Sequence, residues 1–305
     1  MPGPTGPLRK PVRTMAMLLG LMIAGVAPGD AEDRQGVRDA AKSILDAQLP
    51  ASERDALIAS NRDRAGELIA ALAEGLGQDS AEEYRRIPRI WQVAIAAGKE
   101  NREETLREVL KVSLPQPGGA LADWQAVVIG GGIINGIGLI GEWPRARIER
   151  VLGADAALKD RWEQLLKQAV MMADNPGVKN GTRYDALRMV AMLGWEASHD
   201  QLLRYLGNAA NGELQMGAVS GFVDIPDSAA AETLLKQFPN LTPGNQNMAL
   251  EGLLRSEERT LALLAAIERG DVTAAQLGED RAKRLRSSES AKVKERASAV
   301  LKAAP

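Results

Sequence analysis

Few side chains in this sequence have a type and spacing suited to catalysis, metal binding or cofactor attachment. The chain of 305 residues has no Cys and a single His, His199. Without Cys there is no disulfide, thiolate nucleophile, iron–sulfur cluster or attached c-type haem, and one His cannot form a multi-His metal site. We therefore expect no metal, no haem and no other cofactor, and the sequence identifies no catalytic residue.

His199 and the adjacent acidic pairs are the remaining candidates for acid–base chemistry. His199 follows Ser198 and precedes Asp200 near the start of an expected helix. A general base paired with Asp200 is one interpretation. We favour a surface residue beside a helix cap, with Ser198 as the N-cap. Acidic neighbours such as Glu82 and Glu83 point in different directions on a helix, so we expect solvated faces rather than an acid–base pair.

A run of three glycines lies within residues 127–135, after an apolar stretch. A strand followed by a glycine loop is typical of dinucleotide-binding folds. Here Asn135 replaces the third glycine of that fingerprint, and Pro144 interrupts the helix that should follow. Glycines also allow two helices to pack closely. We therefore expect a helical face of small residues and no nucleotide site.

Trp and Arg side chains supply the candidates for binding a partner. Trp143 precedes Pro144 and Arg145 at an expected helix end, and exposed Trp and Arg are common binding anchors. Basic residues are also concentrated in residues 281–302. An anionic partner is one interpretation of that segment, and a polar capping repeat is the one we favour. The partner-binding candidates are Trp143, Arg145, Arg281, Arg284, Lys292 and Arg296.

The N-terminal segment has the pattern of an export signal. Basic residues precede an apolar run over residues 15–27, and small residues flank Asp30. This is typical of a secretory signal peptide cut after Ala31, and 13 apolar residues are too few to span a bilayer comfortably. We expect residues 1–31 to be removed and the chain to be periplasmic or extracellular. Contact with a membrane is expected only if this segment stays uncleaved.

Helical segments recur with a regular spacing in the C-terminal half of the chain. Residues 186–194, 216–224 and 248–256 align, and their starts are 30 and 32 residues apart. A short turn and a second apolar helix follow each of them. The sequence therefore predicts an all-α fold, an α-solenoid of HEAT-like helix–turn–helix repeats. We expect N-terminal helices in residues 32–80 and the repeat array over residues 81–303.

Several segments carry a resemblance to a known repeat region. They are residues 187–193, 202–206, 212–218, 234–243, 253–257, 263–270, 281–288 and 293–297. From about Glu83 to Leu301 the chain resembles the HEAT-like helical repeat region of large exported dehydrogenase/cytochrome c proteins of planctomycetes and related bacteria. There the array often lies between a sugar-dehydrogenase-like β-propeller and a c-type cytochrome domain. The resemblance implies the helical array alone, since the chain has no Cys-x-x-Cys-His, and it carries over no catalytic residue.

These patterns favour a non-enzymatic exported scaffold that binds another exported protein on the concave face of the solenoid. The resemblance suggests a role accessory to a periplasmic sugar dehydrogenase/cytochrome system. A HEAT-like nucleic-acid-binding protein with a basic C-terminal patch is an alternative, although the formal net charge of −2 gives no global attraction to nucleic acid. An enzyme with an unrecognised carboxylate site is another, and it predicts a deep polar pocket with shifted acidic pKa values.

Overall fold

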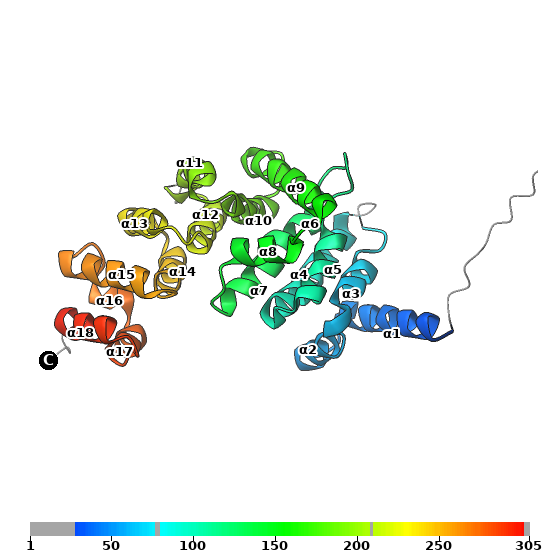
Figure 1. Ribbon diagram of the computed structural model, residues 1–305, viewed down its shortest axis with the longest axis horizontal. Helices are drawn as coiled ribbons and strands as arrows, with labels where there is room; N and C mark the ends of the chain where they lie inside the picture. The colour runs from blue at the N-terminus through cyan, green and yellow to red at the C-terminus, as the bar shows by residue number, and fades with distance from the viewer. Residues whose placement is uncertain (1–27, 77–79, 208–209, 302–305) are drawn as a thin grey trace, which may run out of the picture.

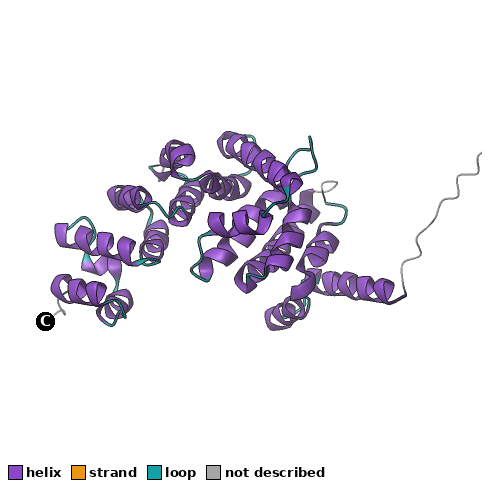
Figure 2. Ribbon diagram, in the orientation of Figure 1, coloured by secondary structure: helices purple, strands orange, loops and turns teal. Residues whose placement is uncertain are grey.

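The computed structural model describes residues 28–76, 80–207 and 210–301, and over these ranges the regular structure is entirely helical (Figure 2). The predicted all-α class is therefore confirmed. The helices follow one another along an arch, with α1 (Pro28–Leu45) at one end and α18 (Ala291–Val300) at the other (Figure 1). The predicted signal peptide lies outside the described residues, except for residues 28–31, which begin α1.

The C-terminal half consists of helix pairs in two layers. The pairs are α10 (Asn180–Val190) with α11 (Trp195–Leu206), α12 (Gly212–Asp224) with α13 (Ser228–Gln237), and α14 (Pro243–Leu253) with α15 (Glu257–Arg269). The first helices pack on one another in the order α10, α12, α14, and the second helices in the order α11, α13, α15. The short α16 (Ala274–Leu277), α17 (Glu279–Arg286) and α18 close this end, with α18 packed on α15 and α17. The aligned segments of the sequence are thus the equivalent helices of one layer.

The N-terminal half is less regular. After α1 come α2 (Ala51–Ser60), α3 (Ala65–Ala73), α4 (Ser80–Glu100), α5 (Glu103–Ser113), α6 (Asp123–Ala126), α7 (Ile134–Leu139), α8 (Pro144–Leu152) and α9 (Ala156–Asp174). Between α6 and α7 the chain forms a π-helical segment, η2 (Val127–Ile133). Short 3-10 turns occupy η1 (Arg62–Arg64), η3 (Ala191–Leu193) and η4 (Phe238–Asn240). Helix η2 packs on both α4 and α10, so it joins the two halves.

One apolar core runs along the whole array, because each helix buries a stripe of residues three or four apart. In α5 this stripe is Leu106, Val109 and Leu110, and all three side chains are fully or almost fully buried. Within the described residues no single helix is long and apolar enough to cross a bilayer. The helical stretch Asp123–Leu139 passes that test only together with α8, from which it is bent by 108°.

The glycine run lies inside this core and is helical. A Cβ at Gly130 would lie 2.3 Å from the carbonyl oxygen of Asp185, and one at Gly132 would lie 2.2 Å from the Cβ of Ala94. Farther on, a Cβ at Gly136 would lie 2.7 Å from the Cα of Gly98. Side chains at these positions would push α4, η2 and α10 apart. The predicted small-residue face is therefore confirmed, and the strand that a dinucleotide site requires is replaced by helix.

Candidate functional site: an acidic and aromatic cavity

Residues of α4, α6, the start of η2, the start of α10 and α12 line a cavity of about 570 Å³. Figure 1 labels these helices along the arch. Its size is within the range of small-ligand sites, about 300–1,000 Å³. Four carboxyl side chains and one ammonium line it, together with three aromatic rings and several apolar side chains. The charged residues are Glu83, Asp123, Asp185, Glu213 and Lys179, and the rings are those of Tyr84, Trp91 and Tyr184.

The π-helical segment brings the wall residues together. A Cβ on Gly131 would lie 2.3 Å from Trp91 Nε1 and 2.5 Å from Asp185 Oδ1. The bare backbone of Gly131 therefore leaves room for the indole of α4 and the carboxyl of α10 on the same side of η2. A π-helical turn interrupts the regular hydrogen bonding of an α-helix, and such turns are frequent at functional sites. In this protein the turn lets two side chains approach that are far apart in the sequence.

Asp185 is the unusual group of this wall. Its residue is 6% exposed, and its Oδ1 has no hydrogen-bond partner. Burial raises the pKa of Asp185 well above 3.8, with a smaller raising effect from Glu213, while Arg188 opposes the shift. A buried polar atom without a partner costs about 1–3 kcal/mol, so such atoms require an explanation. This oxygen is enclosed by neighbouring atoms beside Gly131, and its residue belongs to the cavity wall.

A second pair of carboxyls lies nearer the solvent. Burial raises the pKa of Glu83 above 4.5, the negative charge of Asp123 raises it further, and Lys179 lowers it. The ammonium Nζ of Lys179 lies 3.9 Å from the centre of the Tyr84 ring, which is a cation–π distance. The Tyr84 side chain is otherwise open to solvent, since the residue is 60% exposed. The mouth of the cavity therefore already holds one cation.

The four carboxyl groups of the cavity are not arranged around a single point, as metal ligands are. Among the residues that the structure describes, no group of three or more His, Asp or Glu side chains is placed to hold one ion. Divalent cations such as Ca²⁺ need several oxygen ligands at 2.3–2.6 Å from one point. The four carboxyls instead surround a wide cavity with aromatic walls.

Trp143 and Arg145 lie at the start of α8, whereas the sequence suggested the end of a helix, and Trp143 is the N-cap residue of α8. Trp143 is half-buried, however, and the guanidinium carbons of Arg255 and Arg259 lie 4.7 and 5.0 Å from its ring centre. The pKa of Arg259 falls to about 10 because of burial and the nearby charge of Arg255. Trp143 thus contacts the chain's own cations and is not the exposed anchor that its position suggested. Arg145 is exposed, pairs with Glu149 at 2.9 Å and donates to the carbonyl of Leu193.

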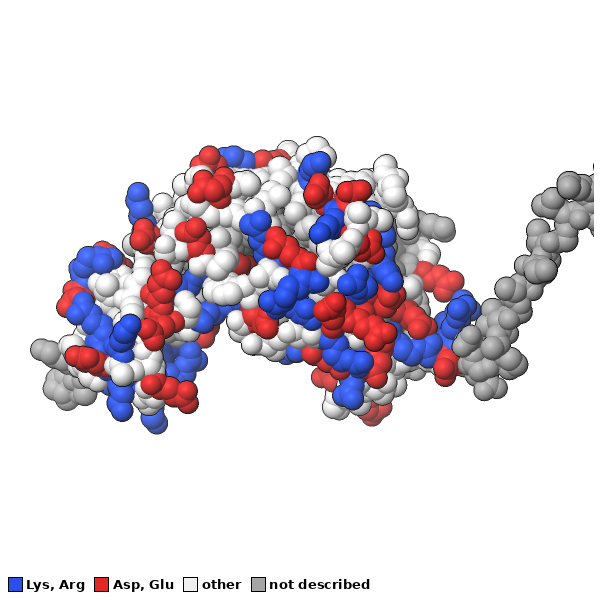
Figure 3. All heavy atoms as spheres, in the orientation of Figure 1, with Lys and Arg blue, Asp and Glu red and all other residues white. Residues whose placement is uncertain are grey.

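The four basic candidates near the C-terminus all pair with acidic side chains of earlier helices. Arg281 and Arg284 of α17 contact Glu251 of α14, at 2.7 and 3.5 Å. Lys292 of α18 lies 3.8 Å from Glu257 of α15, and Arg296 contacts Glu268. Acidic and basic side chains are also interspersed on the face seen in Figure 3. This pairing fits the capping interpretation better than a basic surface for an anionic partner.

His199 and Ser198 lie within α11, which begins earlier than the sequence indicates. Gly194, with φ 87°, is the N-cap residue, and the Oγ of buried Ser198 donates to the Gly194 carbonyl at 2.6 Å. The predicted N-cap at Ser198 is therefore wrong. The His199 ring stacks on Trp195 at 4.8 Å, and its Nε2 lies 3.0 Å from Asp200 Oδ1. These contacts hold the half-buried ring against its own helix.

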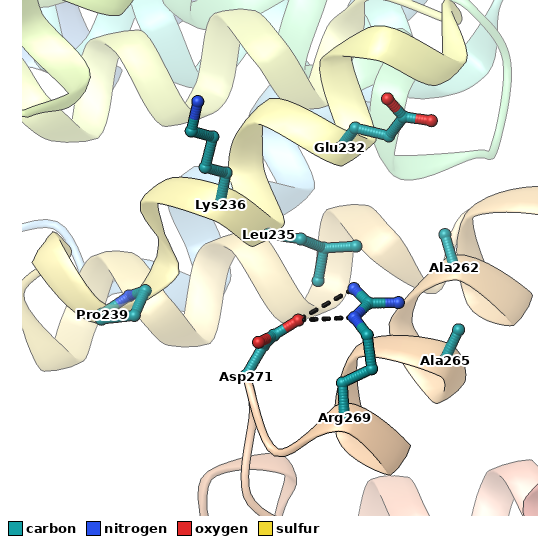
Figure 4. A pocket seen from close by; sticks show the side chains of 8 residues that line it. All are labelled: Glu232, Leu235, Lys236, Pro239, Ala262, Ala265, Arg269 and Asp271. Atoms are coloured by element: carbon teal, nitrogen blue, oxygen red, sulfur yellow. Dashed lines mark hydrogen bonds and ion pairs between the residues drawn. The ribbon is translucent and has the colours of Figure 1, made fainter.

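A second cavity, of about 560 Å³, separates α13 from α15 (Figure 4). Small side chains, Ala262 and Ala265, line it on α15. Its charged side includes Arg269, which already pairs with Asp271 at 2.8 Å. Figure 4 shows this ion pair facing the side chain of Leu235. This guanidinium and carboxylate satisfy each other, and none of the described residues that line the cavity is aromatic. The second cavity therefore offers a ligand less than the first one does.

Sequence reasoning missed the cavity at α4, although it named one of its residues. Glu83 was expected on a solvated face, but it lines the cavity, while its neighbour Glu82 pairs with Arg85 and Arg86. The available signal was Asp185, because this acidic residue immediately precedes the apolar helical segment 186–194. A charge in such a position needs a partner.

Comparison of the chain with protein-family models, with curated proteins and with solved structures finds no match. The resemblance to HEAT-like repeat regions therefore remains an expectation from the sequence. The chemistry of the cavity is defined by its own residues, which are four carboxyls, one ammonium and three aromatic rings.

Proposed function

We propose that the chain is a non-enzymatic exported binding protein, built as an α-solenoid of HEAT-like repeats. The layered order of the helices supports this proposal, since α10, α12 and α14 stack in one layer while α11, α13 and α15 stack in the other. Repeat arrays of this kind bind partners on extended concave surfaces. The arch in Figure 3 is hollowed along its lower edge, between the C-terminal helices and the middle of the chain.

The observation that carries the proposal is the cavity between α4, α6, α10 and α12. It combines an exposed aromatic ring, Tyr84, with a buried carboxyl group that lacks a partner, Asp185. Aromatic anchors and desolvated polar pockets are what protein-binding surfaces use to concentrate their affinity. The partner is another exported protein, and the resemblance suggests a component of a periplasmic sugar dehydrogenase/cytochrome system.

Site-specific photocrosslinking in the native cells tests this function. A photoreactive amino acid at position 84 should form a crosslink to one stoichiometric envelope protein. The same probe at Leu203, which is 38% exposed on α11, should not. Crosslinking of the Tyr84 probe should also disappear when Trp91 is changed to Ala. No adduct at position 84, or equal adducts at positions 84 and 203, would contradict a partner-binding role for the cavity.

One observation favours a second function, an enzyme that uses the cavity carboxyls. The pKa values of Glu83 and Asp185 are both raised, which is the property of a general acid. In that case, incubating envelope material with the wild-type protein should release reaction products. The Glu83→Gln variant should release none. Equal product profiles for the two proteins would leave partner binding as the function of the site.

A further inference from the structure

We propose that the cavity between α4, α6, α10 and α12 binds an alkylammonium group, and that Lys179 occupies the ammonium position until the ligand arrives. The inference deepens the proposed function and rests on the same site. Two sources share this chemistry, a lysine side chain of a bound partner and a free alkylamine. The experiment below distinguishes them.

The contact between Lys179 and Tyr84 shows that an ammonium fits the mouth of the cavity. The Nζ atom lies 3.9 Å from the ring centre, and both side chains are exposed. Lys179 is also the N-cap residue of α10, where a positive charge is unfavourable for the helix dipole. The position of this lysine therefore does not stabilise its own helix. It is explained by the acidic and aromatic surroundings of its ammonium.

The cavity has more carboxyl groups than its own cation can neutralise. Glu83, Asp123, Asp185 and Glu213 line it, and Lys179 is the one basic side chain among the lining residues. Asp185 is the most buried of the four, and its Oδ1 lacks a partner. Its basic neighbour Arg188 does not fill this role, because Arg188 Nε donates to Asp224 at 2.8 Å.

An ammonium supplies what the site lacks. It brings a positive charge and three N–H donors, and it can sit against an aromatic face. The apolar side chains of Ile87, Trp91 and Met216 in the same cavity provide surface for a carbon chain. An inorganic cation would make no use of these walls. An alkyl chain ending in an ammonium matches both the apolar and the acidic parts of the lining.

The test titrates the purified protein with two probes, n-butylammonium and Nα-acetyl-lysine N-methylamide, and follows the indole N–H signal of Trp91 by NMR. Both probes should shift that signal, and the Nε-acetylated form of the lysine probe, which has no charge, should not. Trp91→Phe assigns the signal among the five Trp residues. The other four indole signals report whether each variant keeps the native fold.

Two sets of variants separate this proposal from a general attraction of cations to an acidic surface. Lys179→Ala should bind both probes more tightly, because the competing ammonium is gone. Tyr84→Ala should bind about two- to fivefold more weakly and Tyr84→Phe should bind as the wild type does, since the ring supplies the cation–π contact. The pair Glu83→Gln/Asp123→Asn should weaken binding more than the matched pair Asp280→Asn/Glu289→Gln, whose exposed residues lie near the C-terminal end of the arch.

The outcomes identify the source of the ammonium or overturn the proposal. Tighter binding of the lysine probe indicates a partner's side chain, and equal or tighter binding of butylammonium indicates a free amine. No shift of Trp91 with either probe, or unchanged affinity in Lys179→Ala, would overturn the alkylammonium site. The titration needs no partner protein, so its result does not depend on photocrosslinking. A failed titration contradicts the alkylammonium site, whereas failed photocrosslinking contradicts partner binding.

Discussion

Arg188 of α10 and Asp224 at the end of α12 form a buried ion pair, with Arg188 Nε donating to Asp224 Oδ2 at 2.8 Å. The other oxygen of Asp224 accepts from Arg255 Nη1 at 3.0 Å. The same Arg255 donates through Nη2 to the carbonyl of Glu142, which precedes α8. The Asp224 carboxylate therefore connects α10, α12 and the end of α14, and Arg255 links them to the segment before α8.

Asp224→Asn should destabilise the protein by about 3–5 kcal/mol, because it leaves two largely buried guanidinium groups without their counter-charge. Urea unfolding followed by circular dichroism measures the change. The loss of stability caused by Asp224→Asn should be smaller in a protein that also carries Arg188→Met, since one of the unpaired charges is then absent. Equal costs in the two backgrounds would mean that the Arg188–Asp224 pair contributes no coupling energy.

Gly130→Ala should destabilise the protein by about 1–3 kcal/mol, since the added methyl would meet the Asp185 carbonyl oxygen at 2.3 Å. Backbone cannot move aside as a flexible side chain does, so η2 and α10 would have to separate. Gly244→Ala is the matched control. Nothing lies within 4 Å of a Cβ at Gly244, which is in the first turn of α14.

The free energy of unfolding of the Gly244→Ala control should rise by up to about 1 kcal/mol, because Ala has a higher helix propensity than Gly. Thermal unfolding of the two variants compares them directly. If Gly130→Ala were as stable as Gly244→Ala, close packing would not explain the glycine run.

The all-α class and several helices could be predicted from the sequence, and the cavity could not, for a physical reason. Apolar residues at helical spacing identify helices such as α12 and α14, because burial of a helix stripe is a local property. Helix α8 was not predicted, because its start at Pro144 read only as the end of another helix. The cavity depends on the long-range meeting of Trp91 and Asp185 across Gly131, and no local pattern encodes that contact.

Asp185→Asn should change how stability depends on pH. Because burial raises the pKa of Asp185 in the folded state well above 3.8, the folded protein holds a proton that the unfolded chain releases. The carboxyl therefore makes stability fall as pH rises from about 4 to the raised pKa, and the contribution is constant above it. Asn carries no titrating proton, so this fall should be absent from the variant.

Melting temperatures of the two proteins at about pH 4 and about pH 8 measure the difference. The variant should be more stable relative to the wild type at the higher pH than at the lower one. A constant difference would mean that Asp185 titrates in its ordinary range. The fold should survive the substitution, because Asn has nearly the shape of the protonated carboxyl group.

Binding of an alkylammonium group should weaken as the pH is lowered through the raised pKa of Glu83. Burial and the charge of Asp123 place this pKa above 4.5, and Lys179 opposes the shift. A bound cation favours the ionised carboxylate, so protonation of Glu83 competes with the ligand. Calorimetry at a series of pH values around the pKa of Glu83 measures the affinity for n-butylammonium. This affinity should fall as the pH is lowered. Glu83→Gln should bind more weakly at neutral pH and its affinity should depend less on pH, and an unchanged slope in that variant would contradict the role of Glu83.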